Sequence, residues 1–203
     1  MAAGPDDSGD NPGGERALAL IELGSIARGH RVADAMLKRA PVTLLRADWV
    51  SPGKFLVLVA GDVASVDEAF AVGVDVAADR IVDRLLLPQA HELLWPALRG
   101  EAVASDVASL GVVETNSVAA TLLGADAAAK GARVRIIAMQ LARGIGGKGF
   151  FSVTGPLEEV EAAVEAAVTV VAAGAIHTTE IIPAPHQDLI TSLAPPGPRD
   201  RTS

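Results

Sequence analysis

Residues 18–42, LALIELGSIARGHRVADAMLKRAPV, and residues 110–134, LGVVETNSVAATLLGADAAAKGARV, are two copies of one pattern. The identical positions in the two copies, each pair 92 residues apart, include Glu22 and Glu114, Asp34 and Asp126, Lys38 and Lys130, and Val42 and Val134. Four matches in the same order at one constant separation indicate an internal repeat. The repeat therefore decides how the rest of the chain is divided.

Two further segments recur downstream. PGKFLVLVAGDVASVDEA (52–69) aligns with GGKGFFSVTGPLEEVEAA (146–163) at a separation of 94, and LLPQAHELL (86–94) aligns with IIPAPHQDL (181–189) at a separation of 95. The shared residues include Gly53 and Gly147, Lys54 and Lys148, Gly61 and Gly155, Pro88 and Pro183, and His91 and His186. Because loop insertions lengthen the separation in small steps, the chain is predicted to be a tandem duplication.

The repeat sets the expected domain boundaries. We expect a disordered leader over 1–15, a first domain over 16–99, a linker over 100–108, a second domain over 109–193 and a disordered tail over 194–203. The leader and the tail are rich in polar residues, glycine and proline, which disfavour a packed core.

Within the first unit, hydrophobic spacing predicts an order of strands and helices. The expected strands are 18–22, 42–45, 55–59 and 84–87, and the expected helices are 30–39, 63–83 and 91–98. Asp62 stands where a helix N-cap belongs. The second unit repeats the order, with a long helix over 157–173. The predicted fold class is α+β: two tandem domains, each an antiparallel sheet packed with helices.

Composition excludes several classes of protein. The net charge of −8 argues against nucleic-acid binding, because no basic excess exists to neutralise phosphates. The chain has no cysteine, which excludes disulfides and thiolate metal sites. The N-terminus lacks the apolar segment of a signal peptide, and no apolar run is long enough for a transmembrane helix. We therefore expect a cytoplasmic protein that binds neither membranes nor nucleic acid.

The stretch RGIGGKGFF (143–151) raises the question of a phosphate-binding loop. Gly144 to Gly149 matches G-x-G-x-x-G, but a dinucleotide site needs this run after a strand and before a helix. Here the run precedes an apolar strand, and a Walker loop also fails because Lys148 is followed by glycine instead of Ser or Thr. A tight turn between two strands is the remaining explanation, although it accounts for only one or two of the glycines.

No catalytic or metal-binding set is evident. The four histidines, His30, His91, His177 and His186, are too far apart in sequence for local metal-ligand spacing. No G-x-S-x-G occurs, and the acidic pairs fall on the polar faces of predicted helices. We predict a protein that is not an enzyme and has no cofactor and no metal.

The duplicated unit resembles the bacterial microcompartment shell domain, over about 17–98 and 109–193. The opening strand and helix, the glycine-bearing loop before a strand and long helix, and the closing P-x-x-H of LPQAHELL and IPAPHQDL carry the resemblance. Each unit opens with the first strand of the family, so the order is non-permuted. The resemblance implies a homotrimer that mimics a hexamer, packed with hexameric tiles and pentameric vertices into a shell in the bacterial cytoplasm. It also implies a central pore for small metabolites. A tandem subtype that holds an iron–sulfur cluster through cysteine has no equivalent here.

The resemblance assigns roles to specific residues. The pore-lining positions are Ser51, Pro52, Gly53, Ile145, Gly146 and Gly147, and the tile-edge contacts are Lys38, Lys130, His91 and His186. Arginine is frequent inside the closing motif of the family, whereas this chain has Gln89 and Ala184.

Three cations lie beside the predicted pore: Lys54, Arg143 and Lys148. One hypothesis is a positive collar that favours anionic metabolites. The alternative is that these side chains form salt bridges or point into solvent. Two other classes of function also stay open: a small-molecule-binding regulator built from duplicated α/β units, and an enzyme, which the missing catalytic set disfavours.

Overall fold

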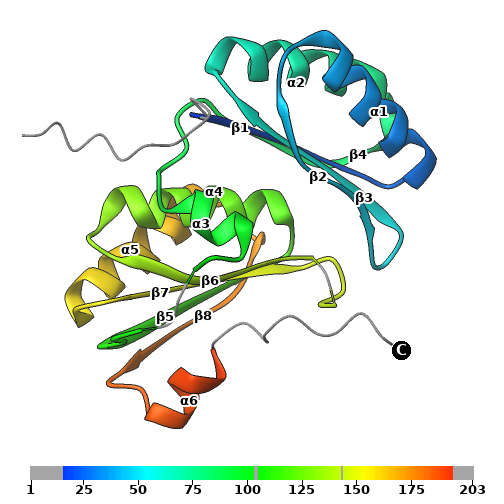
Figure 1. Ribbon diagram of the computed structural model, residues 1–203. Helices are drawn as coiled ribbons and strands as arrows, with labels where there is room; N and C mark the ends of the chain where they lie inside the picture. Colours follow the sequence, from blue (N-terminus) through cyan, green and yellow to red (C-terminus); the bar gives the residue numbers. More distant parts are fainter. Residues whose placement is uncertain (1–15, 103–104, 143, 194–203) are drawn as a thin grey trace, which may run out of the picture.

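The computed structural model describes residues 16–102, 105–142 and 144–193. It contains two four-stranded antiparallel sheets with the same strand order (Figure 1). The first sheet is ordered β2 (Thr43–Val50), β3 (Lys54–Gly61), β1 (Ala17–Leu23) and β4 (Ile81–Leu87). The second is ordered β6 (Arg135–Leu141), β7 (Gly149–Gly155), β5 (Ser109–Thr115) and β8 (Ile176–Pro183). The duplication expected from the sequence is therefore a duplication of one fold.

Two long helices cover one face of each sheet. These are α1 (Ile26–Arg39) and α2 (Val63–Ala77) in the first half, and α4 (Val118–Gly131) and α5 (Leu157–Val170) in the second. A 3₁₀ turn, η1 (Ala78–Arg80), follows α2, and short helices α3 (Leu94–Arg99) and α6 (Gln187–Ser192) follow the last strand of each half. Asp62 caps α2 by accepting from the Ser65 N–H, as predicted.

Several element ends differ from the prediction. The prediction carried α2 to Asp83, but the helix ends at Ala77 because Ala78 has a φ of 50° and its N–H closes on the Val74 carbonyl. The next residues join the sheet, where Ile81 pairs with Leu23. Likewise, α5 ends at Val170.

The helix α1 begins at Ile26, four residues before the predicted start, because the Ser25 side chain caps it by accepting from the Arg28 N–H. The strand β2 extends to Val50, and α3 begins at Leu94 rather than His91.

The two halves are stacked, so the first sheet is covered on both faces. Its alternate residues Ala19 and Ile21 pack under α1 and α2, while Leu18 and Leu20 point the other way into a core shared with α3, α4 and α5. A strand presents successive side chains to opposite faces, so β1 and β3 must be apolar throughout when both faces are buried. The unbroken run FLVLVAG of β3 is the result.

The outer face of the second sheet is more open. Among the described residues, α6 is the helix on that side (Figure 1), and Val112, Glu114 and Phe150 remain partly exposed. Within the described ranges, no helix is long and apolar enough to cross a membrane.

Candidate functional site

The two loops predicted to line a pore lie next to each other. One joins β2 to β3 over 51–53, and the other joins β6 to β7 over 142–148 (Figure 1). A Cβ placed on Gly147 would lie 3.0 Å from the Ser51 carbonyl oxygen and 3.4 Å from Cδ of Pro52. The fold thus brings together residues that are nearly a hundred positions apart in sequence.

Backbone geometry explains the glycines of the second loop. Gly144, Gly146 and Gly147 have φ values of 76°, 66° and 82°, which side-chain-bearing residues adopt only with strain. The loop closes through the Ala142 N–H, which donates to the Lys148 carbonyl at 2.9 Å. Gly149 has a different reason, since a Cβ there would collide with the Thr121 side chain on α4. The loop joins two strands, the context in which the sequence argued against a phosphate site.

Both lysines beside the loops are paired with carboxylates. Lys54 Nζ lies 3.4 Å from Glu22 Oε2, and Lys148 Nζ lies 3.0 Å from Glu114 Oε1 and 3.0 Å from His177 Nε2. Since each lysine charge is compensated, the geometry favours the salt-bridge alternative over a collar of free cations. Arg143 lies outside the described residues.

Glu22 is a buried polar contact between the two halves. Its carboxylate is fully buried, and Oε1 accepts from the Ala119 N–H, in the first turn of α4, at 2.8 Å. A helix N-terminus carries unsatisfied N–H groups and a partial positive charge, so it is a good partner for an anion. Burial raises the pKa of Glu22, although the Ala119 N–H and Lys54 oppose the shift. Beside it, Asp83 Oδ2 accepts from the Ser117 hydroxyl at 2.6 Å.

The closing motif of the first half also contacts α4. Asp126 accepts from the His91 N–H at 2.8 Å and from Lys130 Nζ at 2.6 Å. Lys130 Nζ also donates to the Gln89 carbonyl at 2.6 Å. Two of the predicted edge residues, His91 and Lys130, therefore belong to the junction between the halves.

The corresponding residues of the other copy are exposed. Lys38 pairs with Asp34 on the surface of α1 at 2.7 Å, and His186 Nδ1 accepts from the Asp188 N–H at the start of α6. At each of these two repeat positions, one residue makes a hydrogen bond between the halves and its counterpart is exposed on the surface.

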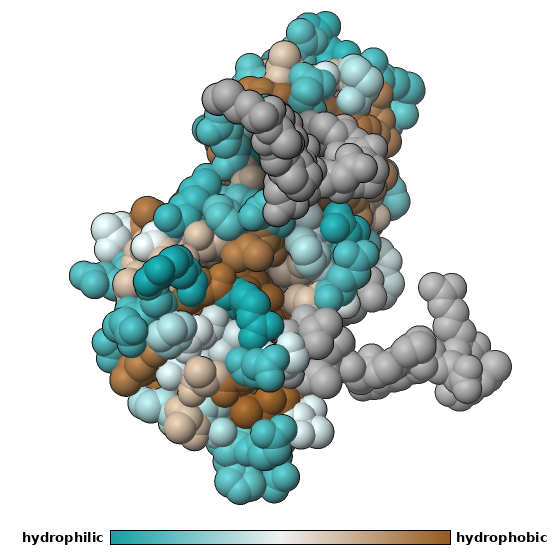
Figure 2. Space-filling view, turned by 60° about the vertical axis from the view of Figure 1, so that its left-hand side comes forward, coloured by the Kyte–Doolittle hydropathy of each residue, from teal (hydrophilic) through white to brown (hydrophobic). Residues whose placement is uncertain are grey.

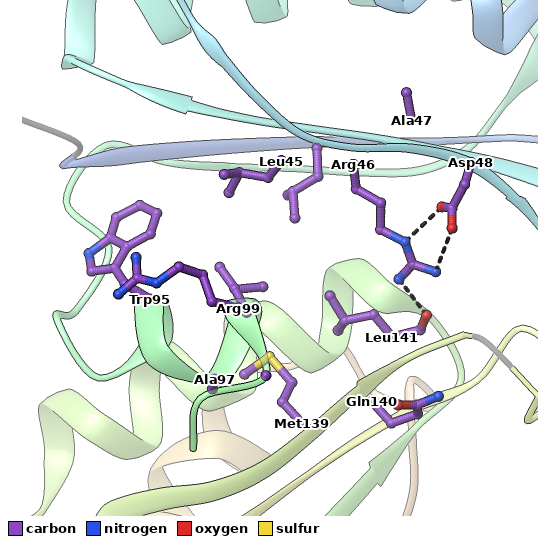
Figure 3. Close-up of a pocket in the computed structure, with 13 residues that line it drawn as sticks. Leu45, Arg46, Ala47, Asp48, Trp95, Ala97, Arg99, Met139, Gln140 and Leu141 are labelled. Carbon is purple, nitrogen blue, oxygen red and sulfur yellow. Dashed lines mark hydrogen bonds and ion pairs between the residues drawn. The ribbon is translucent and has the colours of Figure 1, made fainter. Parts of the chain in front are cut away.

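A cleft of about 640 Å³ separates β2 from α3 and β6 (Figure 3). Arg46 spans it: Nε and one terminal nitrogen donate to the Asp48 carboxylate, and the other terminal nitrogen donates to the Leu141 carbonyl at 2.7 Å. Leu58 and Trp95 contribute apolar lining. Because its guanidinium donates to both halves, Arg46 helps to hold the junction in register.

Sequence reasoning missed the bonds from Glu22 to α4, from Asp83 to Ser117 and from Arg46 to β6. One signal was available: the pair Glu22 and Lys54 recurs as Glu114 and Lys148, and both pairs prove to be ion pairs. A carboxylate and a lysine that recur together in a duplicated unit are candidates for an ion pair.

Within the described part of the chain, no three His, Asp or Glu side chains are placed to hold a metal ion.

Comparison with known proteins identifies the duplicated unit. The BMC domain model matches residues 17–90 and again 109–185. The bacterial microcompartment shell protein PduT of Citrobacter freundii is 39% identical over 175 residues, which cover 86% of this chain and 95% of that protein. The carboxysome assembly protein CcmO of Synechococcus elongatus is 31% identical over 195 residues, 89% of this chain and 69% of that protein.

Solved structures agree. A microcompartment protein from Desulfitobacterium hafniense DCB superposes with a TM-score of 0.80 at 39% identity, over 86% of this chain and 97% of that one. A fused permuted shell protein of the RMM microcompartment superposes with a TM-score of 0.57 at 20% identity, over 77% of this chain and 81% of that one. At this identity the likeness shows the fold alone. Each half begins with its central strand, β1 or β5, and each family match is continuous within its half. The chain therefore belongs to the BMC-domain family, as a non-permuted tandem-domain member of the bacterial microcompartment shell proteins.

Proposed function

We propose that this shell protein works as a homotrimeric tile in which six BMC domains surround a central pore for small metabolites. The tile packs with other shell proteins, hexameric tiles and pentameric vertices among them, in the bacterial cytoplasm. It has a structural rather than a catalytic role. The two domains extend over 16–99 and 109–193.

One observation carries the trimer: apolar residues buried at the junction inside the chain have exposed counterparts elsewhere. Val118 and Ile26 are the first residues of α4 and α1; Val118 is 0% exposed and Ile26 is 41% exposed. Leu141 pairs with Gly149, and Trp49 pairs with Phe55, the counterpart of Gly149 in the first half; Leu141 is 9% exposed and Trp49 is 68% exposed. The face of the first half that includes α1 therefore carries apolar residues at positions that are buried in the second half, but in the monomer nothing packs against it.

The complementary face is open on the second half. Leu94 in α3 is fully buried between the halves, whereas its counterpart Leu189 in α6 is 38% exposed. One face of the molecule accordingly shows apolar patches among polar side chains (Figure 2). Two complementary open faces at opposite ends of a chain favour head-to-tail association, which gives a closed ring when the rotation closes. The family resemblance supports a ring of three chains.

The proposal of a pore is supported by the adjacency of the two loops. A threefold axis beside them would gather Ser51, Pro52, Gly53, Ile145, Gly146 and Gly147 from every chain around one opening. We retain Lys38, Lys130, His91 and His186 as contacts near the tile edge. Of these, His91 and Lys130 also make hydrogen bonds across the domain junction.

The trimer can be tested by measuring mass in solution and by electron microscopy. The wild type is expected to form trimers with a central opening. Trp49→Asp places a charge on the open apolar face and is expected to give monomers with an unchanged circular dichroism spectrum. The matched control is Val168→Asp on α5, an exposed apolar position (44%) away from both open faces, which is expected to remain trimeric. A wild type that stays monomeric at high concentration contradicts the proposal.

A further inference from the structure

Glu114 occupies the place in the second half that Glu22 occupies in the first. Both stand one residue from the end of equivalent strand pairings, opposite Leu56 and Phe150, and each is paired with the lysine that follows its loop. Their surroundings differ: Glu22 is fully buried, whereas the Glu114 side chain is 34% exposed. Glu22 accepts from an α-helical N–H of the neighbouring half, whereas the contacts described for Glu114 are with Lys148 and His177.

The matching donor is exposed on the first half. Ala27 is the second residue of α1, as Ala119 is of α4. N–H groups in the first turn of a helix have no partner within the helix. The Ser25 cap takes the Arg28 N–H, and among the described hydrogen bonds none uses the Ala27 N–H.

We propose that Glu114 accepts a hydrogen bond from the Ala27 N–H of a second copy and thereby holds the protomers together. The bond repeats, between chains, the one that Glu22 makes to Ala119 within the chain. This inference rests on the proposed trimer, because it needs α1 of one chain against the outer face of the second sheet of another. Beyond the trimer itself, the inference identifies Glu114 as a residue on which the contact between chains depends.

The contact between chains depends on one carboxylate. Inside the chain, Asp83 supplies a second acceptor, for the Ser117 hydroxyl. The position of Asp83 on β4, opposite Glu22, is taken on β8 by Thr178, opposite Glu114. At this strand pairing the second half therefore has one carboxylate, Glu114, where the first half has two. Lys148, at 3.0 Å, compensates its charge when a partner covers it.

The first test removes the acceptor. Glu114→Ala is expected to raise the dissociation constant of each contact between two chains by about tenfold to a hundredfold, the effect of losing one hydrogen bond to a charged group. The trimer has three such contacts, so its overall dissociation rises by more. Glu114→Gln keeps an oxygen acceptor and is expected to weaken the trimer less. The control is Glu161→Ala on the exposed surface of α5, which removes the same charge from another site. Sedimentation measures the association, and circular dichroism checks that the monomers are folded.

The second test uses the absence of cysteine from the chain. Mixing separately purified Glu114→Cys and Ala27→Cys proteins with a short bismaleimide is expected to give a covalent dimer on a denaturing gel. Glu161→Cys mixed with Ala27→Cys is expected to give none. If the wild type is trimeric but Glu114→Ala associates normally and the first pair does not cross-link, the contact is wrong and the tile stands. If the wild type is monomeric, both proposals fail.

Discussion

The carboxylate of Glu22 shows how one residue can fix the junction of two domains. It is buried, and it satisfies both the Ala119 N–H and Lys54. Removing it leaves a buried donor and a partly buried cation without their acceptor. Glu22→Ala is therefore expected to lower the free energy of unfolding by about 2 kcal/mol, and Glu22→Gln by less, because the amide oxygen still accepts. Urea unfolding in the monomeric Trp49→Asp background measures both.

The same residue predicts a pH dependence. Because burial raises the pKa of Glu22, the folded chain binds this proton more readily than the unfolded chain. Its contribution to stability is present at low pH and is lost as the pH rises above the ordinary glutamate value of 4.5. The stability of Glu22→Gln relative to Glu22 is therefore expected to rise with pH above that value. A constant difference across the titration would contradict the raised pKa of Glu22.

At the scale of elements, the packing of α1 on β3 depends on a glycine. A Cβ on Gly29 would lie 2.7 Å from Cβ of Phe55. Alanine has the higher helix propensity, by about 1 kcal/mol, yet overpacking costs about 1–3 kcal/mol. Gly29→Ala is expected to lower the urea midpoint despite that propensity. Adding Phe55→Leu should recover part of the loss, and a stabilised Gly29→Ala protein would show that the helix moves away freely.

The elements that the sequence predicted well are those with strong local signals. The Asp62 cap and apolar periodicity locate the start of α2, and the apolar run before Gly61 locates β3. The end of α2 was missed because alanines favour a helix while pairing of β4 with β1 decides the outcome. Such pairing is a tertiary effect that local propensity does not contain.

At the scale of the whole molecule, the stacking of the halves lay beyond the sequence prediction. The unbroken apolar runs of β1 and β3 are compatible with any two-sided burial, and only the fold identifies α4 as the cover. For the candidate site, the repeat predicted the two loops, while the junction bonds of Glu22 and Arg46 join residues more than ninety positions apart. Hydrophobic periodicity in a sequence does not predict contacts between residues so far apart.

The two tryptophans allow the assembly to be followed directly. Trp95 is buried between the halves, and Trp49 is on the open face. In a Trp95→Phe protein the fluorescence reports Trp49 alone. As the protein concentration is raised, the Trp49 emission is expected to shift to shorter wavelength and its quenching by iodide to decrease, because a partner chain covers the indole. Emission that stays constant while the particle mass triples would place Trp49 outside the contact.

The buried junction inside each chain also bears on the protein concentration at which a tile can form. Of the six domain contacts in the proposed ring, three form when the chains fold and need no encounter between molecules. A linked partner acts as if it were present at high local concentration. Ring formation at equilibrium then varies with the third power of chain concentration, whereas six separate domains would require the sixth power. A scarcely expressed tandem protein can therefore complete its tiles at concentrations where a single-domain relative with equal contact strength would remain unassembled.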